Sequence, residues 1–457
     1  MRMQVFKMRI MENSRRDFIK KTITGAAVAS FGGVLPGYSA KRYSRILGSN
    51  ERILVACMGV NSRGLAVGTN FARQTDCEVL YCCDVDSRAS DKFIGAVNKI
   101  QNKRPKCESD FRRALEDKEL DALVITAPDH WHVPASILAC QAGKHVYVEK
   151  PLGHNPREGE LLIEAVNKYD RVVQMGNQRR SLPNTIAAIR DLHSGIIGRP
   201  YFAKTWYTND RESIGKGKNV PVPSWLNYEL WQGPAPRQPY RDNVIHYNWH
   251  WFWNWGTGEA LNNGTHTVDL ARWGLGVDFP VRVSSEGGRY HYQDDWETPD
   301  TQIINMEFNN KTLISWEGRS CNDHPINGDS SGLVFYGDKG SMSLGRNAYT
   351  VFDMNNKVVK EVKNDVLIED PRSLSSPSQQ LDALHIINFF DAIRKGKKLN
   401  SDVDGGHKST LLVQLGNIAL RSGAALKIDP ENGHILNNRD ALQYWGREYE
   451  PGWEPKV

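Results

Sequence analysis

Three short polar segments carry the side chains best suited to chemistry. Residues 128–132 follow the apolar run 122–127, and residues 149–151 follow the apolar run 145–148. In an open parallel sheet, ligands bind beyond the carboxyl ends of the strands, so we expect both polar segments to face one crevice. The third segment reaches His266 at the start of a predicted helix, below a glycine-rich loop, where an imidazole can contact a substrate hydroxyl.

The elements that would position these residues begin with a strand, a glycine turn and a helix. The apolar run 53–58 leads into Gly59 and Gly64, and a helical pattern starts at residue 65. The first glycine permits the tight turn, the last lets the helix pack close to the strand, and the helix N-terminus offers free N–H groups to a pyrophosphate. Asn61 stands where a middle glycine is usual, and Asn tolerates a positive φ better than most residues.

An acidic residue follows the second predicted strand. The run 78–83 ends at Asp84, twenty residues after Gly64, where a carboxylate accepts hydrogen bonds from the adenosine ribose. Asp86 is expected to cap the next helix instead. The charge of Asp84 favours NAD over NADP because it would meet a 2′-phosphate, although Arg88 just beyond leaves NADP open.

The length and composition predict a two-domain globular protein. A chain of 457 residues exceeds what one hydrophobic core usually serves. We predict a nucleotide-binding domain over residues 48–172 and a second domain over residues 173–457. No run approaches the roughly 18 apolar residues of a membrane span, so we expect no membrane association after processing.

The first forty residues have the layout of a twin-arginine export signal. Arg15 and Arg16 precede a mild apolar stretch over 22–35 and a small-residue exit at 38–40. The alternative is a short basic amphipathic helix, and Met11 could equally be the start codon. We predict a signal peptide over residues 1–40 and a periplasmic protein that is exported folded, a route that often carries a bound cofactor.

Charge and cysteine content exclude several classes of function. Residues 1–40 hold seven Lys/Arg and two Asp/Glu, so the rest of the chain is electrically neutral and predicts no nucleic-acid partner. The seven cysteines lack a C-x-x-C spacing, which argues against a disulfide framework or zinc, and we expect them to be buried. His130 and His132 have no third ligand at suitable spacing, so we predict no metal.

The second half shows the pattern of an antiparallel sheet followed by helices. A helical pattern covers 184–194, and strand patterns cover 201–207, 281–286, 302–308, 312–316 and 332–336. Four tryptophans crowd into residues 249–255. Alternation at period two would place them on one side of an extended segment, as a platform for a sugar face or as packing at the domain junction.

Together these residues resemble the Gfo/Idh/MocA oxidoreductases, a family named after glucose–fructose oxidoreductase, inositol dehydrogenase and a rhizopine-catabolism protein. The resemblance rests on the Gly59 turn, Asp84, residues 126–132, the triplet 149–151 and Gly264-x-His266-x-x-Asp269. It implies an α/β protein with an N-terminal Rossmann domain and a C-terminal α+β domain that holds a large, open, mostly antiparallel sheet. An exposed face of that sheet would need covering, which predicts a homo-oligomer, a dimer or a tetramer.

The resemblance also implies roles for individual residues. His266 would take the hydroxyl proton of a sugar or polyol, while Lys150 would hold the same oxygen and stabilise the developing alkoxide. The predicted substrate-binding residues are Lys150, Arg180, Trp251, Asn262 and His266. The predicted cofactor-binding residues are Gly59, Asn61, Ser62, Arg63, Gly64, Asp84, Thr126, Pro128, His130, His132, Glu149, Lys150 and Gln178.

One position departs from the family pattern. Many dehydrogenases of the family have an aspartate four residues before the histidine, and this chain has Asn262 there, so Glu259 or Asp269 would have to supply the charge. Three functions stay open: a sugar or polyol oxidoreductase with a tightly bound NAD or NADP, an NAD-dependent glycosidase that works by transient C3 oxidation and elimination, and a non-catalytic sugar-binding protein.

Overall fold

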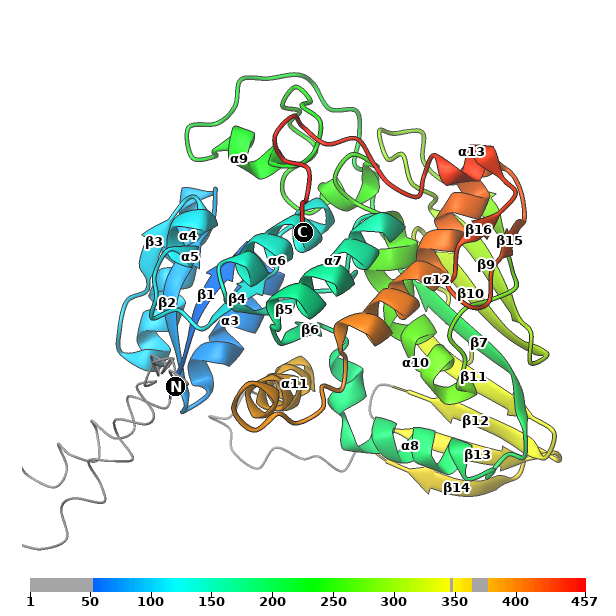
Figure 1. Cartoon of the computed structure of the whole chain (residues 1–457). Coiled ribbons are helices and arrows are strands. Elements are labelled where there is room, and N and C mark those ends of the chain that lie inside the picture. The colour runs from blue at the N-terminus through cyan, green and yellow to red at the C-terminus, as the bar shows by residue number, and fades with distance from the viewer. Residues whose placement is uncertain (1–51, 346–347, 364–376) are drawn as a thin grey trace, which may run out of the picture. The chain divides into compact units, whose positions relative to one another are not determined.

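The computed structural model describes residues 52–345, 348–363 and 377–457. The predicted signal peptide lies outside these residues. Arg52–Val457 forms one compact unit, in which two sheets lie side by side (Figure 1). The N-terminal sheet is parallel, and its described strands are ordered β3-β2-β1-β4-β5-β6.

Apart from the exposed edge strand β3, the N-terminal strands are short and mostly buried, as expected for a parallel sheet covered by helices on both faces. They are β1 (Ile53–Met58), β2 (Cys77–Cys83), β3 (Lys106–Glu108), β4 (Ala122–Ile125), β5 (His145–Val148) and β6 (Val173–Met175). The helices of this part are α3 (Arg63–Arg73), α4 (Ser87–Gln101), α5 (Phe111–Leu115), α6 (Asp129–Gln141) and α7 (Pro156–Tyr169). This is the predicted Rossmann-type architecture.

Side-chain caps fix where several of these helices begin. Asp86 accepts hydrogen bonds from the backbone N–H groups of Arg88 and Ala89, which confirms the predicted cap of α4. Asn155 caps α7 in the same way, with Pro156 at the first helical position.

The C-terminal sheet is large and mostly antiparallel, as predicted. Its described strands are ordered β14-β13-β12-β11-β7-β10-β9-β8-β15-β16, and only the β7–β10 pairing within it is parallel. The strands are β7 (Pro200–Thr208), β8 (Arg282–Gly288), β9 (Thr301–Phe308), β10 (Thr312–Arg319), β11 (Ser331–Gly337), β12 (Gly340–Leu344), β13 (Tyr349–Asp353), β14 (Val358–Val362), β15 (Leu426–Ile428) and β16 (Ile435–Leu436).

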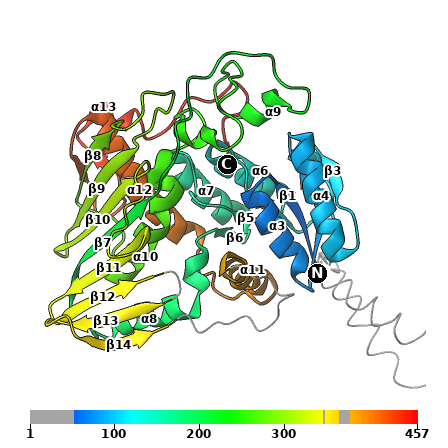
Figure 2. The ribbon, with the colours of Figure 1, turned by 180° about the vertical axis from the view of Figure 1, so that it is seen from behind.

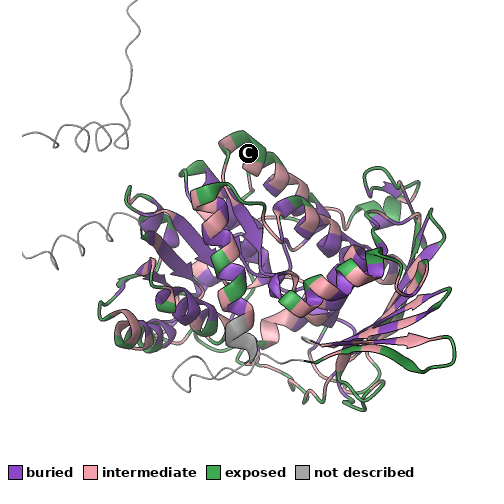
Figure 3. Ribbon diagram, turned by 90° about the horizontal axis from the view of Figure 1, so that it is seen from below, coloured by how far each residue is buried: buried purple, intermediate pink, exposed green. Residues whose placement is uncertain are grey.

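One face of this sheet is covered by helices. Alternate residues of β10 are buried, and the buried set packs with residues of α8 (Pro183–His193), α10 (Thr265–Leu275) and α12 (Val403–Ser422) in one apolar core. Figure 3 shows this alternation along the strands, in contrast to the continuous burial of the N-terminal sheet. Helix α11 (Pro377–Lys395) packs on the Rossmann side instead, where Phe389 and Phe390 join the core beneath α3.

A long connection between β7 and α10 returns to the Rossmann domain. We call residues 225–255 of this connection the strap; it contains α9 (Tyr228–Gln232) and the 3₁₀ helix η2 (Asn248–Trp251). In Figures 1 and 2 it arches over the end of the N-terminal sheet. The backbone N–H of Ser87 donates to the carbonyl of Trp225 over 3.0 Å, and that of His130 donates to Trp255 over 3.2 Å. The strap is thus tied to the Rossmann domain at two separated points.

Two expectations from the sequence are wrong in detail. The tryptophan-rich segment is not extended, because Asn248–Trp251 forms a 3₁₀ helix, so period-two alternation does not place its rings on one side. Six of the cysteines are buried as expected, but Cys107 is exposed on the edge strand β3. Among the described residues, no helix is long and apolar enough to cross a membrane.

Candidate active site

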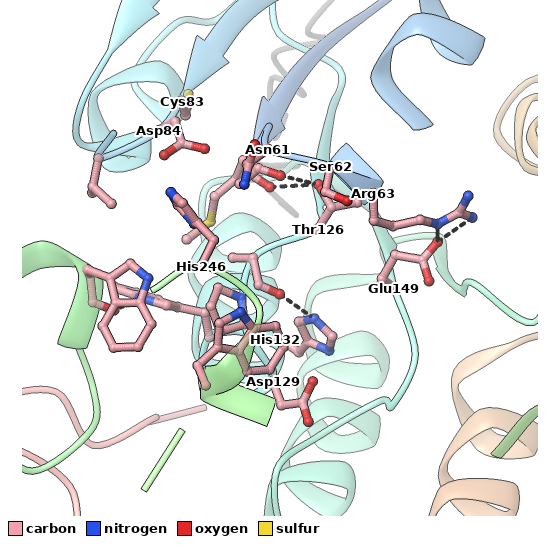
Figure 4. A pocket seen from close by; sticks show the side chains of 18 of the residues that line it. Asn61, Ser62, Arg63, Cys83, Asp84, Thr126, Asp129, His132, Glu149 and His246 are labelled. Carbon is pink, nitrogen blue, oxygen red and sulfur yellow. Dashed lines mark hydrogen bonds and ion pairs between the residues drawn. The ribbon is translucent and has the colours of Figure 1, made fainter. Parts of the chain in front are cut away.

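A cavity of about 510 Å³ opens where the carboxyl ends of the Rossmann strands meet the strap and the start of α10. Figure 4 shows polar side chains from several of these elements around it. The predicted site residues that line the cavity are Gly59, Asn61, Ser62, Arg63, Asp84, Thr126, Pro128, His132, Glu149, Lys150, Gln178, Asn262 and His266. Segments far apart in the sequence are therefore brought to one place.

The two glycines of the turn are required by close packing of the backbone around it. Gly59 has φ +77°, and a Cβ there would lie 2.5 Å from the backbone nitrogen of Ala127. A Cβ on Gly64 would lie 1.9 Å from the carbonyl oxygen of Gly59, so this glycine allows α3 to pack close to the strand, as predicted, without lining the cavity. Ser62 makes no side-chain cap, which leaves N–H groups at the start of α3 free for an anion in the described structure.

Asp84 is held in place by the backbone around it. Its Oδ2 accepts from the N–H of Val60 at 2.6 Å and its Oδ1 accepts from the N–H of Asp86 at 2.9 Å. Burial raises the pKa of Asp84, and these two hydrogen bonds oppose the rise. Each carboxylate oxygen keeps a further lone pair, so the side chain can still accept from ribose hydroxyls.

Arg88, the residue that left NADP open, is already engaged. Its guanidinium donates to both carboxylate oxygens of Asp86, at 3.1 and 2.9 Å, and lies 3.3 Å from the ring centroid of Trp225 in the strap. His246 of the strap contacts Asp86 at 2.7 Å. Although burial opposes it, hydrogen bonds from Arg88 and His246 lower the pKa of Asp86 to about 2. The charge of Arg88 is therefore already paired with that of Asp86, and it is not free to attract the 2′-phosphate of NADP.

Lys150 projects from the end of β5 toward the start of α10. Its Nζ donates to the backbone carbonyl of Asn262 at 2.6 Å and to the Oδ1 of the same residue at 3.1 Å. An ammonium carries three N–H groups, so one stays available for a ligand. Burial lowers the pKa of Lys150, and the carboxylates of Glu149 and Asp129 oppose this.

His266 is the second residue of α10 and lines the same cavity. The described residues make no hydrogen bond to its ring. Burial, together with the charge of Lys150, lowers the pKa of His266 to about 3. With this lowered pKa, the imidazole ring is neutral across the physiological range.

Glu149, the neighbour of Lys150 in the sequence, belongs to a network of charged and polar side chains that line the cavity. It accepts from Arg63 Nη2 at 2.8 Å and from Gln178 Nε2 at 2.7 Å, and Arg63 also pairs with Asp382 of α11 at 2.6 Å. Although burial opposes it, Arg63 and Lys150 lower the pKa of Glu149, so the carboxylate stays ionised. Figure 4 shows Arg63 directed toward Glu149, which leaves its side chain little freedom to bind a cofactor.

Three further predicted residues lie away from the cavity lining, each for a physical reason. His130 is fully buried, and its ring nitrogens contact the carbonyls of Trp231 and Trp255, so it anchors the strap. Arg180 pairs with Asp269 at 2.7 Å in the domain interior. Trp251 is 1% exposed and stacks on Trp296 with ring centroids 3.9 Å apart, so it packs the interior and presents no sugar platform.

Sequence reasoning missed several residues that line the cavity. Asp129 is 3% exposed and accepts from Thr257 Oγ1 at 2.5 Å. The strap adds His246, Tyr247, Trp249 and His250, and the rings of Trp249 and His250 stack with centroids 3.6 Å apart. The crowding of aromatic residues at 247–255 was the available signal, but it did not show which rings face the cavity.

The lining fits a dinucleotide by its shape and its donors. Gly59 lines the cavity without a side chain, the start of α3 has no capping side chain, and Asp84 keeps free lone pairs. A family model described as the NAD-binding Rossmann fold of an oxidoreductase family matches residues 53–177, and the C-terminal alpha/beta domain of the same family matches residues 192–453. The chain belongs to the Gfo/Idh/MocA oxidoreductase family.

Relatives of this family member include both hydrolases and dehydrogenases. A glycosyl hydrolase family 109 protein of Saccharopolyspora erythraea is 26% identical over 50% of this chain and 55% of its own length. A levoglucosan dehydrogenase of Pseudarthrobacter phenanthrenivorans is 30% identical over 37% of this chain and 36% of its own length. The chain thus spans about half or less of the length of these curated relatives.

A solved structure of levoglucosan dehydrogenase, in complex with NADH and levoglucosan, has the same fold. The match has a TM-score of 0.64 at 18% identity and covers 82% of this chain and 99% of that one. The fold of the Rossmann domain and of the sheet that faces it is therefore shared with an enzyme whose structure holds a nicotinamide cofactor and a sugar.

Proposed function

We propose that this protein is an oxidoreductase that transfers hydride between a secondary alcohol of a sugar or polyol and a tightly held nicotinamide cofactor, NAD in preference to NADP. The observation that carries the proposal is the convergence of Lys150 and His266 on one cavity with a nucleotide-binding turn. When bound, the cofactor supplies hydride acceptance and return. Asp84, Gly59 and the start of α3 would hold it.

The two convergent side chains have complementary tasks. His266 carries no hydrogen bond from the described residues and is neutral, so it can take the hydroxyl proton. Lys150, fixed by Asn262, has an N–H left to stabilise the negative charge that develops on the same oxygen. Asp129 and Glu149 flank Lys150 and keep the region balanced in charge.

The strap supports the proposal that the cofactor stays bound. It is tied beside β2, where Asn227 N–H donates to the Val85 carbonyl over 2.9 Å, and again at the start of α6 through His130. These contacts would hold the strap over a bound dinucleotide and slow its release. A retained cofactor suits a reaction in which each oxidation is followed by a reduction in the same site.

A glycoside-cleaving reaction is the second candidate. The similarity to a glycosyl hydrolase family 109 protein favours it. In such a reaction the sugar carbon is oxidised and later reduced again, so no cofactor is consumed. The same two residues would serve, with His266 or Lys150 moving the protons.

We further propose that residues 1–40 are a twin-arginine signal that exports the folded protein to the periplasm, where it works as a homo-oligomer. The sequence of Arg15 and Arg16 before a mild apolar stretch supports export. A cofactor loaded before export would suit a compartment that supplies little free NAD. Periplasmic fractions of cells with and without the Arg15→Lys, Arg16→Lys pair would test this.

The proposal is tested by denaturing the purified protein and identifying released nucleotide by mass spectrometry. Absorbance of the reduced nicotinamide is then followed with a panel of hexoses, polyols and aryl glycosides, with Lys150→Met as the inactive control. Stoichiometric NAD reduced by one sugar supports the oxidoreductase, and glycoside cleavage without net reduction supports the second candidate. A protein that neither carries nor takes up a nucleotide would overturn both.

A further inference from the structure

Lys150 owes its position to Asn262, which makes the orientation of this amide important. The segment Ala260–Gly264 forms a π-helical turn at the start of α10. Such a widened turn displaces backbone carbonyls from the α-helical pattern. The Asn262 carbonyl instead accepts from Lys150 at 2.6 Å, and the side-chain oxygen accepts from the same amino group at 3.1 Å.

The amide of Asn262 is itself oriented by a carboxylate. Its Nδ2 donates to Glu259 Oε1 at 3.3 Å, so its oxygen must point the other way, toward Lys150. An amide that is free to rotate could present either its oxygen or its NH₂ group to the ammonium, and only the oxygen binds a donor. Glu259 therefore selects the productive orientation.

Glu259 is held firmly and away from the cavity. Arg211 Nε donates to its Oε2 at 2.5 Å, Ser320 Oγ donates to the same oxygen at 3.2 Å, and Asn263 donates to Oε1. Its side chain is 3% exposed and lies outside the cavity lining. A group that cannot touch a ligand but fixes a neighbour that does is a positioning residue.

We propose that Glu259 positions Lys150 through Asn262, and that this carboxylate excludes a second one at position 262. An aspartate there would put two carboxylates within 3.3 Å of each other, the present distance between Asn262 Nδ2 and Glu259 Oε1. The amide of Asn262 accepts the hydrogen bond of Lys150, and Glu259 supplies the nearby negative charge. A single aspartate at position 262 could do both. The inference rests on the proposed role of Lys150 but is measurable without turnover.

The ionisation of Lys150 reports on this arrangement. The charged groups that face it are Glu149, Asp129, Glu259 and Arg63, and the neutral ring of His266 lies beside it. Glu259 raises the pKa of Lys150 against the lowering effect of burial. Removal of its charge is therefore expected to lower the pKa of Lys150 further, and each unit of fall makes the reactive, unprotonated fraction about tenfold larger below the pKa.

The experiment is competitive labelling of lysines with acetic anhydride over a range of pH, with Lys150 followed by mass spectrometry in the protein as purified. Glu259→Gln is expected to shift the labelling midpoint of Lys150 downward, and Asn262→Asp to shift it upward and lower Tm. The double variant should return both toward wild type. Asp294→Asn, which removes a similarly buried pair with Arg289 outside the strap, is the control for lost stability alone.

The outcomes separate this inference from the proposed function. If Glu259→Gln labels like wild type and like the control, Glu259 only anchors Arg211 and the inference fails. If the shift persists when Asn262→Ala is combined with Glu259→Gln, it is an effect of charge alone and the inference fails. If the shift requires Asn262 but no sugar is oxidised or cleaved, the positioning role stands and the proposed function fails. In an active protein, kcat of Glu259→Gln should fall about tenfold, less than for loss of a group that transfers a proton itself, with little change in KM.

Discussion

Two regions of the cavity wall use their polar groups in opposite ways. Where the strap meets the end of β2, Asp86 accepts from Arg88, from two backbone N–H groups and from His246, and its hydrogen-bonding capacity is filled. Where β5 meets α10, the ring of His266 has no hydrogen bond from the described residues, and Lys150 keeps one N–H free. Filled capacity holds a structure together, whereas spare capacity is available to a ligand.

This contrast predicts different consequences of substitution in the two regions. At the β5 end, loss of a side chain should impair the reaction more than the fold. At the β2 end, it should loosen the strap and shorten cofactor residence while the chemistry continues. The variants below test whether the two regions are separable in this way.

The largest effect is expected for Lys150→Met. The substitution keeps the length of the side chain but removes the charge at the developing alkoxide, so the rate of the chemical step should fall by about 10³-fold. Single-turnover reduction of the bound cofactor measures this step directly. Lys144→Met is the control, since Lys144 is also largely buried but donates only to the carbonyls of Asp117 and Leu120. Equal losses in both variants would contradict the assignment.

His266→Asn should cost about 10²-fold in kcat, because Asn can hold a hydroxyl but cannot take its proton. The pKa of His266 is lowered to about 3, so the imidazole is the neutral form throughout neutral pH. Protonation of this ring should inactivate the wild type only as the pH falls toward 3. A profile of kcat/KM against pH that loses activity near pH 6.5 would show that the ring is solvated and the low pKa wrong.

The sequence predicts the residues at the ends of the Rossmann strands better than the residues of the strap. Gly59, Asp84 and Lys150 could be placed because each follows a recognisable strand, and parallel strands bring their carboxyl ends together. His246 could not, because nothing local indicates that it reaches Asp86, 160 residues earlier. The same limit applies to Arg180 and Trp251, whose burial is set by Asp269 and Trp296 from distant segments.

At the strap, His246→Ala removes a hydrogen bond to a carboxylate, an interaction worth about 1.5–3 kcal/mol. Because other contacts also hold the strap, we expect about tenfold faster release of NAD and an unchanged single-turnover rate. Release is followed by trapping free NAD with a coupled enzyme. His291→Ala, in a separate loop, is the control. If His246→Ala instead slowed the chemical step and left NAD release unchanged, the two regions would not be separable.

The contacts of Asp86 with Arg88 and His246 should also respond to acid. Asp86 has its pKa lowered to about 2 by its hydrogen-bonding partners, so its contribution to stability is complete above its ordinary pKa of about 3.9 and is lost as the pH falls from there toward 2. Tm of the wild type should fall more steeply across this window than Tm of Asp86→Asn. If Tm of the wild type and of Asp86→Asn fell in parallel with pH, the ionised Asp86 would contribute nothing to stability.

The smallest effect separates two neighbouring tryptophans. Trp249 lines the cavity, whereas Trp251 stacks on Trp296 in the interior. Trp249→Phe removes part of an aromatic surface and should raise KM about threefold, since aromatic contacts contribute about 0.5–1.5 kcal/mol. Trp251→Phe should lower Tm and leave KM as it is. The reverse pattern would place the sugar on the Trp251 side and would require the strap to move before substrate binds.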